Sequence, residues 1–582
     1  MQNFSQQCID LARAVLGQSL PFIAENGDVL PAEGESLALE DSAYAAFSIG
    51  EYYRCLQELQ LSDFQLPELA ARCVRSQLYI PLTDDIASSC ASLTLLCFGT
   101  TCARNPLWQS LDQETQALVT ERMLHPRQGG HGILSDVVRS FVGFNMGFSK
   151  KDETLPLVEA FLGHVSKKMT NGFMDSAPEE GIGGCYDIIG LWILNFVQQV
   201  MRMHINSDVT KRLLPSIRTY GGCYLCLLPE LVRTDGLAWA YGKHTGFYAQ
   251  LYTLNAAILA LSEGWVGSDK QTLYISLIRR LFHYFFLHYV DQGHGTIVIR
   301  DRERTMPVIF STRRANFDAV RYLCQWAMLA KKISLPLDDT GLEEKTGGRL
   351  VQFDRSIKKE QGIFVYRNSQ KGTHYALPLI SGGGKGSCDS LAFPHCPGIF
   401  DAPADTYLPI LQPELTINGQ LFVPSFYGKN CATGMGLKRS FSFHYDQPEL
   451  ISHREVIVPD LARCRVSWAF SEEGITSEFV YVVRNRLKVD QVRYVIALSA
   501  PHSVLSAHSL MLGEESLRAV VEKDDFGMAW KELITVADDP AYRTPYGHIH
   551  FLQILSRTNP IFLLPGKYYH LKISFRPDIL HL

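Results

Sequence analysis

The segment SLPLDDTGLEEKTGGR, residues 334–349, separates two parts of the chain that have different hydrophobic patterns. It is polar and contains proline, glycine and four acidic residues, which is typical of a linker. Before it, apolar residues recur at the three- and four-residue spacing of helices, whereas after it they alternate with the two-residue period of strands. The sequence therefore predicts an all-α domain over residues 1–333, a linker over 334–349 and an all-β domain over 350–582.

Periodic apolar residues predict about twelve helices before the linker. The predicted helices cover residues 4–16, 41–59, 66–78, 85–101, 112–125, 133–146, 153–169, 186–203, 208–218, 244–262, 270–290 and 316–332. Short and long loops alternate between them, and no segment repeats at the fixed period of a TPR, HEAT or ankyrin array. We therefore expect six antiparallel helical hairpins closed into an α/α toroid, in preference to an open solenoid.

Strand-like segments follow the linker at high density, with glycine and proline turns between them. Examples are GIFVYR at 362–367, TSEFVYVV at 476–483 and HIHFLQIL at 548–555. Many short alternating segments of this kind predict an antiparallel β-sandwich. The predicted fold class is thus a multidomain α-then-β protein, with an N-terminal α/α toroid and a C-terminal antiparallel β-sandwich.

The composition is that of a globular protein, since 46% of the 582 residues are hydrophobic and 20% are charged. A net charge of −5 argues against a nucleic-acid binder or a membrane-surface protein, although a local basic cleft is compatible with it. The N-terminus lacks the pattern of a signal peptide, and no apolar run reaches the roughly 18 residues of a membrane span. We therefore expect a cytoplasmic protein that binds neither nucleic acid nor membrane.

The fourteen cysteines are expected to be reduced thiols in the core. Cys223 and Cys226 have Cys-x-x-Cys spacing, but no second Cys or His pair and no βαβ pattern accompanies them. The sequence therefore predicts no metal and no cofactor.

The segment DGLAWAYGKHTGFY, residues 235–248, gathers tyrosine, lysine and histidine just before an apolar helical pattern. His244 and Tyr248 are four residues apart, so on a helix they share one face. Histidine and tyrosine often transfer protons, and a cation such as Lys243 or His244 beside Tyr241 or Tyr248 would lower the pKa of a phenol from about 10. The alternative interpretation is a set of partly buried polar aromatics at the start of a core helix.

Four further polar residues lie in glycine-rich turns or at predicted helix ends, namely His131, Asn145, Tyr186 and Asp187. Each is a candidate for contact with a ligand at the end of the toroid. Structural alternatives are a solvated loop histidine for His131, a C-terminal cap for Asn145 and a helix-start carboxylate for Asp187.

Arginines gather before the last predicted helix. Arg313 and Arg314 directly precede it and are the preferred carboxylate or sulfate binders, because a guanidinium group forms two parallel hydrogen bonds with such anions. The arginines at 300, 302 and 304 alternate with acidic residues, and we interpret them as a solvated charge run.

A toroid followed by an antiparallel sandwich resembles the polysaccharide lyases of the heparinase, alginate-lyase and chondroitin-lyase type. The segment YGKHTGFY at 241–248 looks like the His/Tyr helix start of those enzymes, and LAFPHCPGIF at 391–400 looks like a turn in heparinase-like β domains. The Asn-Asn-His signature of those lyases is not found in the chain.

The resemblance implies β-elimination on an acidic oligosaccharide or polysaccharide that contains a uronic acid. The proton on C5 is removed and the O4-linked sugar leaves, which requires a base, an acid and a group that neutralises the neighbouring carboxylate. The residues it implies for base and acid are His244, Tyr248 and Tyr241. The residues that we assign to substrate binding, from their chemistry and their places in the chain, are Asn145, His131, Tyr186, Asp187, Lys243, Arg313 and Arg314.

Two other functions remain open at this point. A glycoside hydrolase on an α/α toroid would need two carboxylates in one cleft, for which the loops offer Asp175, Glu180, Asp187 and Asp235. A non-catalytic carbohydrate-binding protein would use the aromatic residues to stack on sugars. The sequence leaves open which uronate and linkage are involved, and also the oligomeric state.

Overall fold

The structure is a computed structural model of the chain. It describes all residues except 1–3, 81–84, 127–132, 176–185, 187, 203–207, 234, 239–245, 300–310, 334–346, 356–358, 369–372, 380–392, 396–410, 426, 437–439, 453–456, 472–473, 499–502, 507–508, 513–516, 535–542, 545–546, 549–550 and 578–582.

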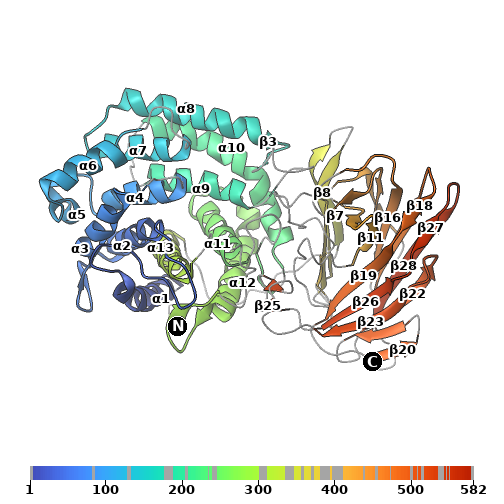
Figure 1. Ribbon diagram of the computed structural model, residues 1–582. Coiled ribbons are helices and arrows are strands. Elements are labelled where there is room, and N and C mark those ends of the chain that lie inside the picture. The colour runs from blue at the N-terminus through green and yellow to red at the C-terminus, as the bar shows by residue number, and fades with distance from the viewer. Residues whose placement is uncertain are drawn as a thin grey trace.

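The described residues of the N-terminal half form helices with a few short hairpins between them (Figure 1). The α-helices are α1 (Phe4–Ser19), α2 (Asp41–Leu56), α3 (Leu66–Gln77), α4 (Asp85–Cys97), α5 (Pro106–Gln109), α6 (Gln113–Met123), α7 (Ile133–Asn145), α8 (Lys151–Lys168), α9 (Ile189–Arg202), α10 (Asp208–Leu231), α11 (Gly246–Ser262), α12 (Gln271–Tyr289) and α13 (Thr312–Ala330). The hairpins are β1 (Gln60–Leu61) with β2 (Phe64–Gln65), β3 (Met169–Thr170) with β4 (Phe173–Met174), and β5 (Val290–Asp291) with β6 (Thr296–Ile297).

The helices form a double ring. The inner ring is α2, α4, α7, α9, α11 and α13, each packed on the next, and α13 closes the ring against α2. The outer helices α1, α3, α6, α8, α10 and α12 alternate with them along the chain. Burial separates the two rings, because α11 is buried on every side from Gly246 to Leu261, whereas α12 buries only one face. The closed ring confirms the predicted α/α toroid.

Several inner helices begin at the same end of the ring. Hydrogen bonds join the first turns of α4 and α7 and the first turns of α2 and α13. Near their C-terminal ends, Glu51 of α2 contacts Cys97 of α4, so these two helices run in the same direction. We call the end at which α2, α4, α7, α11 and α13 begin the mouth of the toroid.

Helix α10 differs from its prediction. The pattern predicted an end near residue 218, but α10 continues to Leu231 and contains Pro215 and Pro229. Proline removes a backbone donor, and Gly221 and Gly222 weaken the helical signal, so local propensity indicated an earlier end. The helix is maintained by packing, since its second half buries Tyr224, Leu227 and Leu228 in the toroid core.

The described residues of the C-terminal half form three main antiparallel sheets. The four-stranded sheet has the order β10 (Phe393–His395), β9 (Thr373–Leu379), β8 (Glu360–Asn368), β7 (Gly347–Arg355). The six-stranded sheet has the order β15 (Ile451–Ser452), β12 (Gln420–Val423), β11 (Pro413–Ile417), β19 (Gln491–Leu498), β26 (Phe551–Arg557), β23 (Ala529–Ile534). The eight-stranded sheet has the order β13 (Lys429–Met435), β14 (Phe441–Gln447), β16 (Arg463–Ser471), β17 (Gly474–Val482), β28 (Tyr568–Pro577), β22 (Leu517–Asp524), β21 (Ser509–Leu512), β20 (Ser503–Ser506). Two further hairpins pair β18 (Leu487–Val489) with β27 (Ile561–Leu563) and β24 (Arg543–Thr544) with β25 (Gly547–His548).

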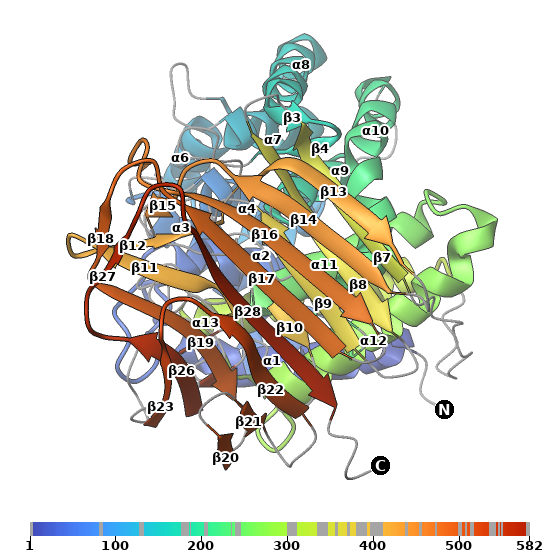
Figure 2. The same ribbon diagram turned by 90° about the vertical axis from the view of Figure 1, so that its right-hand side faces the viewer.

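The sheets stack as the sequence predicted for an antiparallel β-sandwich. Figure 2 shows β14, β16, β17 and β28 of the eight-stranded sheet in front, with the helices behind the sandwich. The aromatic side chains of Phe443, Phe470 and Phe479 fill the core between the sheets. Each is less than 1% exposed, so the alternation in β14, β16 and β17 places one face inward.

The four-stranded sheet joins the two halves of the molecule. On β8, Ile363 and Val365 belong to the core of the toroid, whereas Phe364 and Tyr366 belong to the core of the sandwich. Successive strand residues point to opposite faces, so this sheet is buried on both sides. The domain boundaries remain a prediction, because residues 334–346 lie outside the described part of the chain.

Candidate active site at the mouth of the toroid

Tyr248 lies in the first turn of α11, at the mouth. Its side chain is 2% exposed, and its hydroxyl donates a hydrogen bond to Oδ2 of Asp318 on α13 over 3.1 Å. The Tyr248 ring packs edge-on against Phe247 and lies beside Tyr252. Packing and one directed hydrogen bond therefore orient this phenol.

Two arginines of α13 hold the Asp318 carboxylate. Arg321 donates from Nη2 to Oδ1 over 2.7 Å, and Nε of Arg314 lies 3.7 Å from Oδ2. The three residues follow the spacing Arg-x-x-x-Asp-x-x-Arg, so they share one face of the helix. All three are buried, and burying such charges requires mutual pairing because desolvation is costly.

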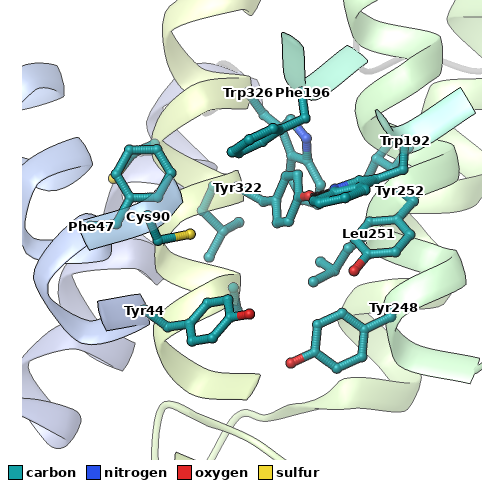
Figure 3. Packing of buried hydrophobic residues seen from close by; sticks show 14 of the residues in the cluster. Tyr44, Phe47, Cys90, Trp192, Phe196, Tyr248, Leu251, Tyr252, Tyr322 and Trp326 are labelled. Carbon is teal, nitrogen blue, oxygen red and sulfur yellow. Dashed lines mark hydrogen bonds between the residues drawn. The ribbon is translucent and has the colours of Figure 1, made fainter. Parts of the chain in front are cut away.

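Arg314 extends the cluster to α2. Its guanidinium carbon lies 3.6 Å from the centroid of the Tyr44 ring, and its Nη2 donates to the Tyr44 hydroxyl over 2.5 Å. Figure 3 shows the hydroxyls of Tyr44 and Tyr248 pointing toward one another from opposite sides of the ring. We call Tyr44, Tyr248, Arg314, Asp318 and Arg321 the mouth cluster.

Polar contacts at the start of α13 fix the position of Arg314. Ser311 is the N-cap and accepts a hydrogen bond from the backbone N–H of Arg314 over 3.0 Å. The Ser311 hydroxyl also donates to the carboxyl group of Asp41 on α2. The backbone N–H of Thr312 donates to both carboxylate oxygens of Glu35, each over 3.2 Å. Two acidic side chains at a helix N-terminus also suit the helix dipole.

Asp41 is the acidic group with the most altered titration near the mouth. The pKa of its carboxyl group is raised to about 6, chiefly by burial and to a smaller extent by the nearby charges of Asp318 and Glu35. The hydrogen bond from Ser311 and the charge of Arg314 oppose this rise in pKa. The first residue of α2, which accepts a hydrogen bond from the N-cap of α13, is therefore a carboxyl group that changes charge near pH 6.

Aromatic side chains fill the ring farther from the mouth, and they lie above Tyr44 and Tyr248 in the view of Figure 3. Trp192 donates from Nε1 to the Tyr322 hydroxyl over 2.6 Å and stacks on Phe196. Burial raises the pKa of Tyr322 to about 12 and also raises the pKa of Tyr252. These two phenols therefore stay protonated at neutral pH and form a floor beneath the mouth cluster.

The structure brings two of the predicted site residues together, since Tyr248 and Arg314 are joined through Asp318. Arg314 lies inside α13, not before it as predicted, because the helix begins at Thr312, after the N-cap Ser311. Arg313 points elsewhere, with its guanidinium carbon 3.2 Å from the centroid of the Phe22 ring, and burial lowers its pKa. The two neighbouring arginines therefore do not act as one anion-binding pair.

Two other predicted residues lie away from the mouth cluster. Asn145 is the last residue of α7, at the opposite end from the mouth, and donates to the carbonyl of Phe141 over 2.7 Å. This contact fits the structural alternative of a C-terminal cap, and a role of Asn145 in substrate binding stays a prediction. Tyr186 is 2% exposed and stacks on Phe353 of β7 at a centroid distance of 4.8 Å, between the toroid and the four-stranded sheet.

The remaining predicted residues lie outside the described residues, namely Tyr241, Lys243, His244, His131 and Asp187. Along the chain they directly precede α11, α7 and α9, each of which is an inner helix.

Of the carboxylates considered for a hydrolase, Glu180 also lies outside the described part. Asp235 accepts hydrogen bonds from Arg233 and does not join the mouth cluster.

Sequence reasoning missed Asp318, Arg321 and Tyr44. The spacing of Arg314, Asp318 and Arg321 was a readable signal, because it places a carboxylate between two cations on one helix face. No local signal marks Tyr44, which lies 270 positions from Arg314 in the chain. Ring closure alone brings them together.

The described residues hold no group of three or more His, Cys, Asp or Glu side chains arranged to bind a metal ion. Within the same residues, no helix combines the length and the apolar character needed to cross a membrane.

Solved structures show the same architecture. The chondroitin AC lyase of Streptomyces coelicolor A3, solved in complex with chondroitin sulphate, aligns over 100% of this chain and 81% of its own, with a TM-score of 0.54 and 10% identity. This chain has the fold of a toroid-and-sandwich polysaccharide lyase. At this level of identity the likeness establishes the fold alone.

Two further solved structures align with lower scores. Heparan sulfate lyase HepC from Pedobacter heparinus covers 99% of this chain and 84% of its own, with a TM-score of 0.42 and 8% identity. A family 88 glycosyl hydrolase from Bacteroides vulgatus covers 56% of this chain and 100% of its own, with a TM-score of 0.40 and 11% identity. No protein-family model and no curated protein matches the sequence.

Proposed function

We propose that this protein is a lyase that cleaves a uronic-acid-containing oligosaccharide or polysaccharide by β-elimination. The observation that carries the proposal is the mouth cluster, in which a buried tyrosine, an aspartate and two arginines meet at the start of inner helices. Such a desolvated polar group is costly to maintain and is typical of a site that handles charge. It lies in a fold shared with a chondroitin AC lyase.

The reaction needs three functions around one sugar ring. A base takes the proton from C5, the electron pair forms the C4–C5 double bond, and the C4–O4 bond breaks. An acid then protonates O4 of the leaving sugar. We assign the acid to Tyr248, whose phenol is oriented by Asp318, and the base to His244, four residues earlier in the chain.

The charge of the uronate carboxylate must be offset as C5 loses its proton. Arg314 and Arg321 both pair with Asp318, which accepts from Tyr248, so these three charged groups carry one net positive charge, and α2, α11 and α13 direct the positive ends of their dipoles to the mouth. This positive potential favours binding of an anionic sugar ring at the mouth over binding of a neutral one. Tyr241, Lys243, His131 and Asp187 remain predicted contributors, since their chain positions adjoin the starts of inner helices.

The decisive variant is Tyr248→Phe, which removes the phenol oxygen and keeps the buried ring. We expect kcat/KM to fall by about 10²-fold or more, the usual contribution of a positioned proton donor. The assay follows the ultraviolet absorbance of the unsaturated product with alginate, hyaluronan, heparan sulfate and chondroitin sulphate as trial substrates.

Tyr445→Phe is the matched control. Tyr445 is also buried and donates one hydrogen bond, to the carbonyl of Pro424 over 2.7 Å, but it lies in the sandwich. Equal activity of the Tyr248→Phe variant and the control would contradict the assignment of Tyr248. Cleavage by wild-type protein that produces new reducing ends without unsaturated rings would identify a hydrolase.

A further inference from the structure

A cavity lies on the outside of the toroid, away from the mouth cluster. It has a volume of about 780 Å³ and runs between the outer helices α10 and α12 to the strands β7 and β8. Figure 1 shows α10 and α12 on the side of the toroid that faces the sandwich. No residue of the mouth cluster lines it, and we call it the outer groove.

The outer groove is rich in basic side chains. Arg218, Lys270 and Arg349 are exposed there, and Arg280 and Arg367 are half-buried. The acidic side chains of the lining are Glu230, which forms an ion pair with Arg349, and Asp269. The lining contains five cationic and two acidic side chains, whereas the whole chain has a net charge of −5. Positive charge is therefore concentrated at the outer groove.

The lining also suits a sugar chain. Trp265 is half-buried at the edge of the groove and offers an aromatic face for stacking. Gly222 of α10 and Gly347 of β7 leave open space, since a Cβ at either position would meet no atom within 4 Å. The first turn of α12 also borders the groove and continues a 3₁₀ turn at Ser268–Lys270, whose N-cap, Gly267, belongs to the lining and has no side chain to cap it. Anionic groups would therefore meet guanidinium groups, an ammonium group and a helix N-terminus together.

We propose that the outer groove is a second binding site for an acidic saccharide, which holds a stretch of the polysaccharide chain outside the mouth. The ligand class rests on the proposed function, because an acidic glycan is the anion that this fold and the mouth cluster favour. The charges, the aromatic face and the open floor are independent of Tyr248. Binding at the groove can therefore be tested without catalysis.

The blocking variant is Gly222→Leu. The added side chain would project into the open space of the groove, and leucine favours a helix more than glycine does, so α10 is not weakened. Gly163→Leu is the matched control, because Gly163 is an exposed glycine of the outer helix α8 with no atom within 4 Å of its Cβ position. A second variant combines Arg218→Ala with Lys270→Ala.

Binding is measured by calorimetry with a uronate hexasaccharide, in the Tyr248→Phe background so that turnover is slow during the titration. We expect Gly222→Leu and the double alanine variant each to weaken binding at one of two sites by about tenfold, a change readily resolved by titration. The Gly163→Leu variant should bind like its parent. Rising salt should weaken the groove site, because its charges are exposed.

The catalytic counterpart compares long and short substrates. KM for the polysaccharide should rise in Gly222→Leu, whereas kcat and KM for a disaccharide-length substrate should stay at the values of the control.

Identical binding by Gly222→Leu and Gly163→Leu overturns the groove site. Equal binding of a neutral hexasaccharide, or binding of inorganic sulfate without any hexasaccharide, overturns the ligand class. Absence of unsaturated product from wild-type protein refutes the proposed function. The calorimetric comparison of Gly222→Leu with Gly163→Leu then decides by itself whether the outer groove binds the saccharide.

Discussion

The substitution Asp318→Asn tests whether the mouth cluster depends on one buried negative charge. Asp318 is 1% exposed, accepts from Arg321 over 2.7 Å and from Tyr248 over 3.1 Å, and lies 3.7 Å from Arg314. Asparagine has nearly the same shape but no charge, so two buried guanidinium groups lose their shared counter-charge. Removing one partner of a buried ion pair costs about 3–5 kcal/mol, and we expect that loss in the free energy of unfolding.

The measurement is urea unfolding followed by far-ultraviolet circular dichroism, which reports the helical domain. Asp460→Asn provides the control, because Asp460 pairs with Arg484 on the surface and both side chains are more than half exposed. An exposed pair of this kind contributes at most about 1 kcal/mol. Adding Arg321→Met to Asp318→Asn should cost less than the sum of the two single changes, since it removes one unpaired charge. A loss below about 1 kcal/mol for Asp318→Asn would refute the central role of this carboxylate.

Two further predictions concern the start of α13 and a close backbone approach. The Asp41 carboxyl group has a pKa of about 6 in the folded protein against 3.8 ordinarily, so the folded state binds more protons between these values. The free energy of unfolding should fall by up to about 3 kcal/mol as pH rises from about 4 to 7. Urea unfolding at several pH values should show that Asp41→Asn removes this dependence. The same pH dependence in wild-type protein and variant would contradict the prediction. Gly236→Ala should lower the free energy of unfolding by about 2 kcal/mol more than Gly264→Ala in the same assay. Both glycines have positive φ, but only at Gly236 would an added Cβ lie 2.0 Å from a backbone oxygen, that of Arg280. Equal losses for the two glycine variants would show that the contact relaxes freely.

Local patterns predicted the fold well where propensity and burial agree. The change in hydrophobic period at residues 334–349 separated helices from strands, and the run of β-branched and aromatic residues in GIFVYR predicted the strand β8. Helix α10 was predicted too short, because Pro215 and Pro229 oppose helix formation locally while core packing maintains it. The start of α13 was placed too late, although Ser311 carried the signal of an N-cap.

The candidate site was only partly predictable for a related reason. Tyr248 was found because it stands at the start of a helix beside histidine and glycine, and Arg314 because it belongs to a basic segment. Arg313 was expected to act with Arg314, but adjacent residues on a helix point in different directions, and Arg313 stacks on Phe22 instead. A side chain's direction depends on the helix register, which the arginine pair does not reveal.

The sequence by itself determined the order of helices and strands, the approximate segments that enter the inner helices, and the chemical types of residue available there. The tertiary structure decided which of them meet. Tyr44, Tyr248 and Asp318 come from α2, α11 and α13, and they converge because α13 closes the ring against α2. Ring closure depends on packing between helices far apart in the chain, and hydrophobic periodicity specifies the buried face of each helix but not its neighbour.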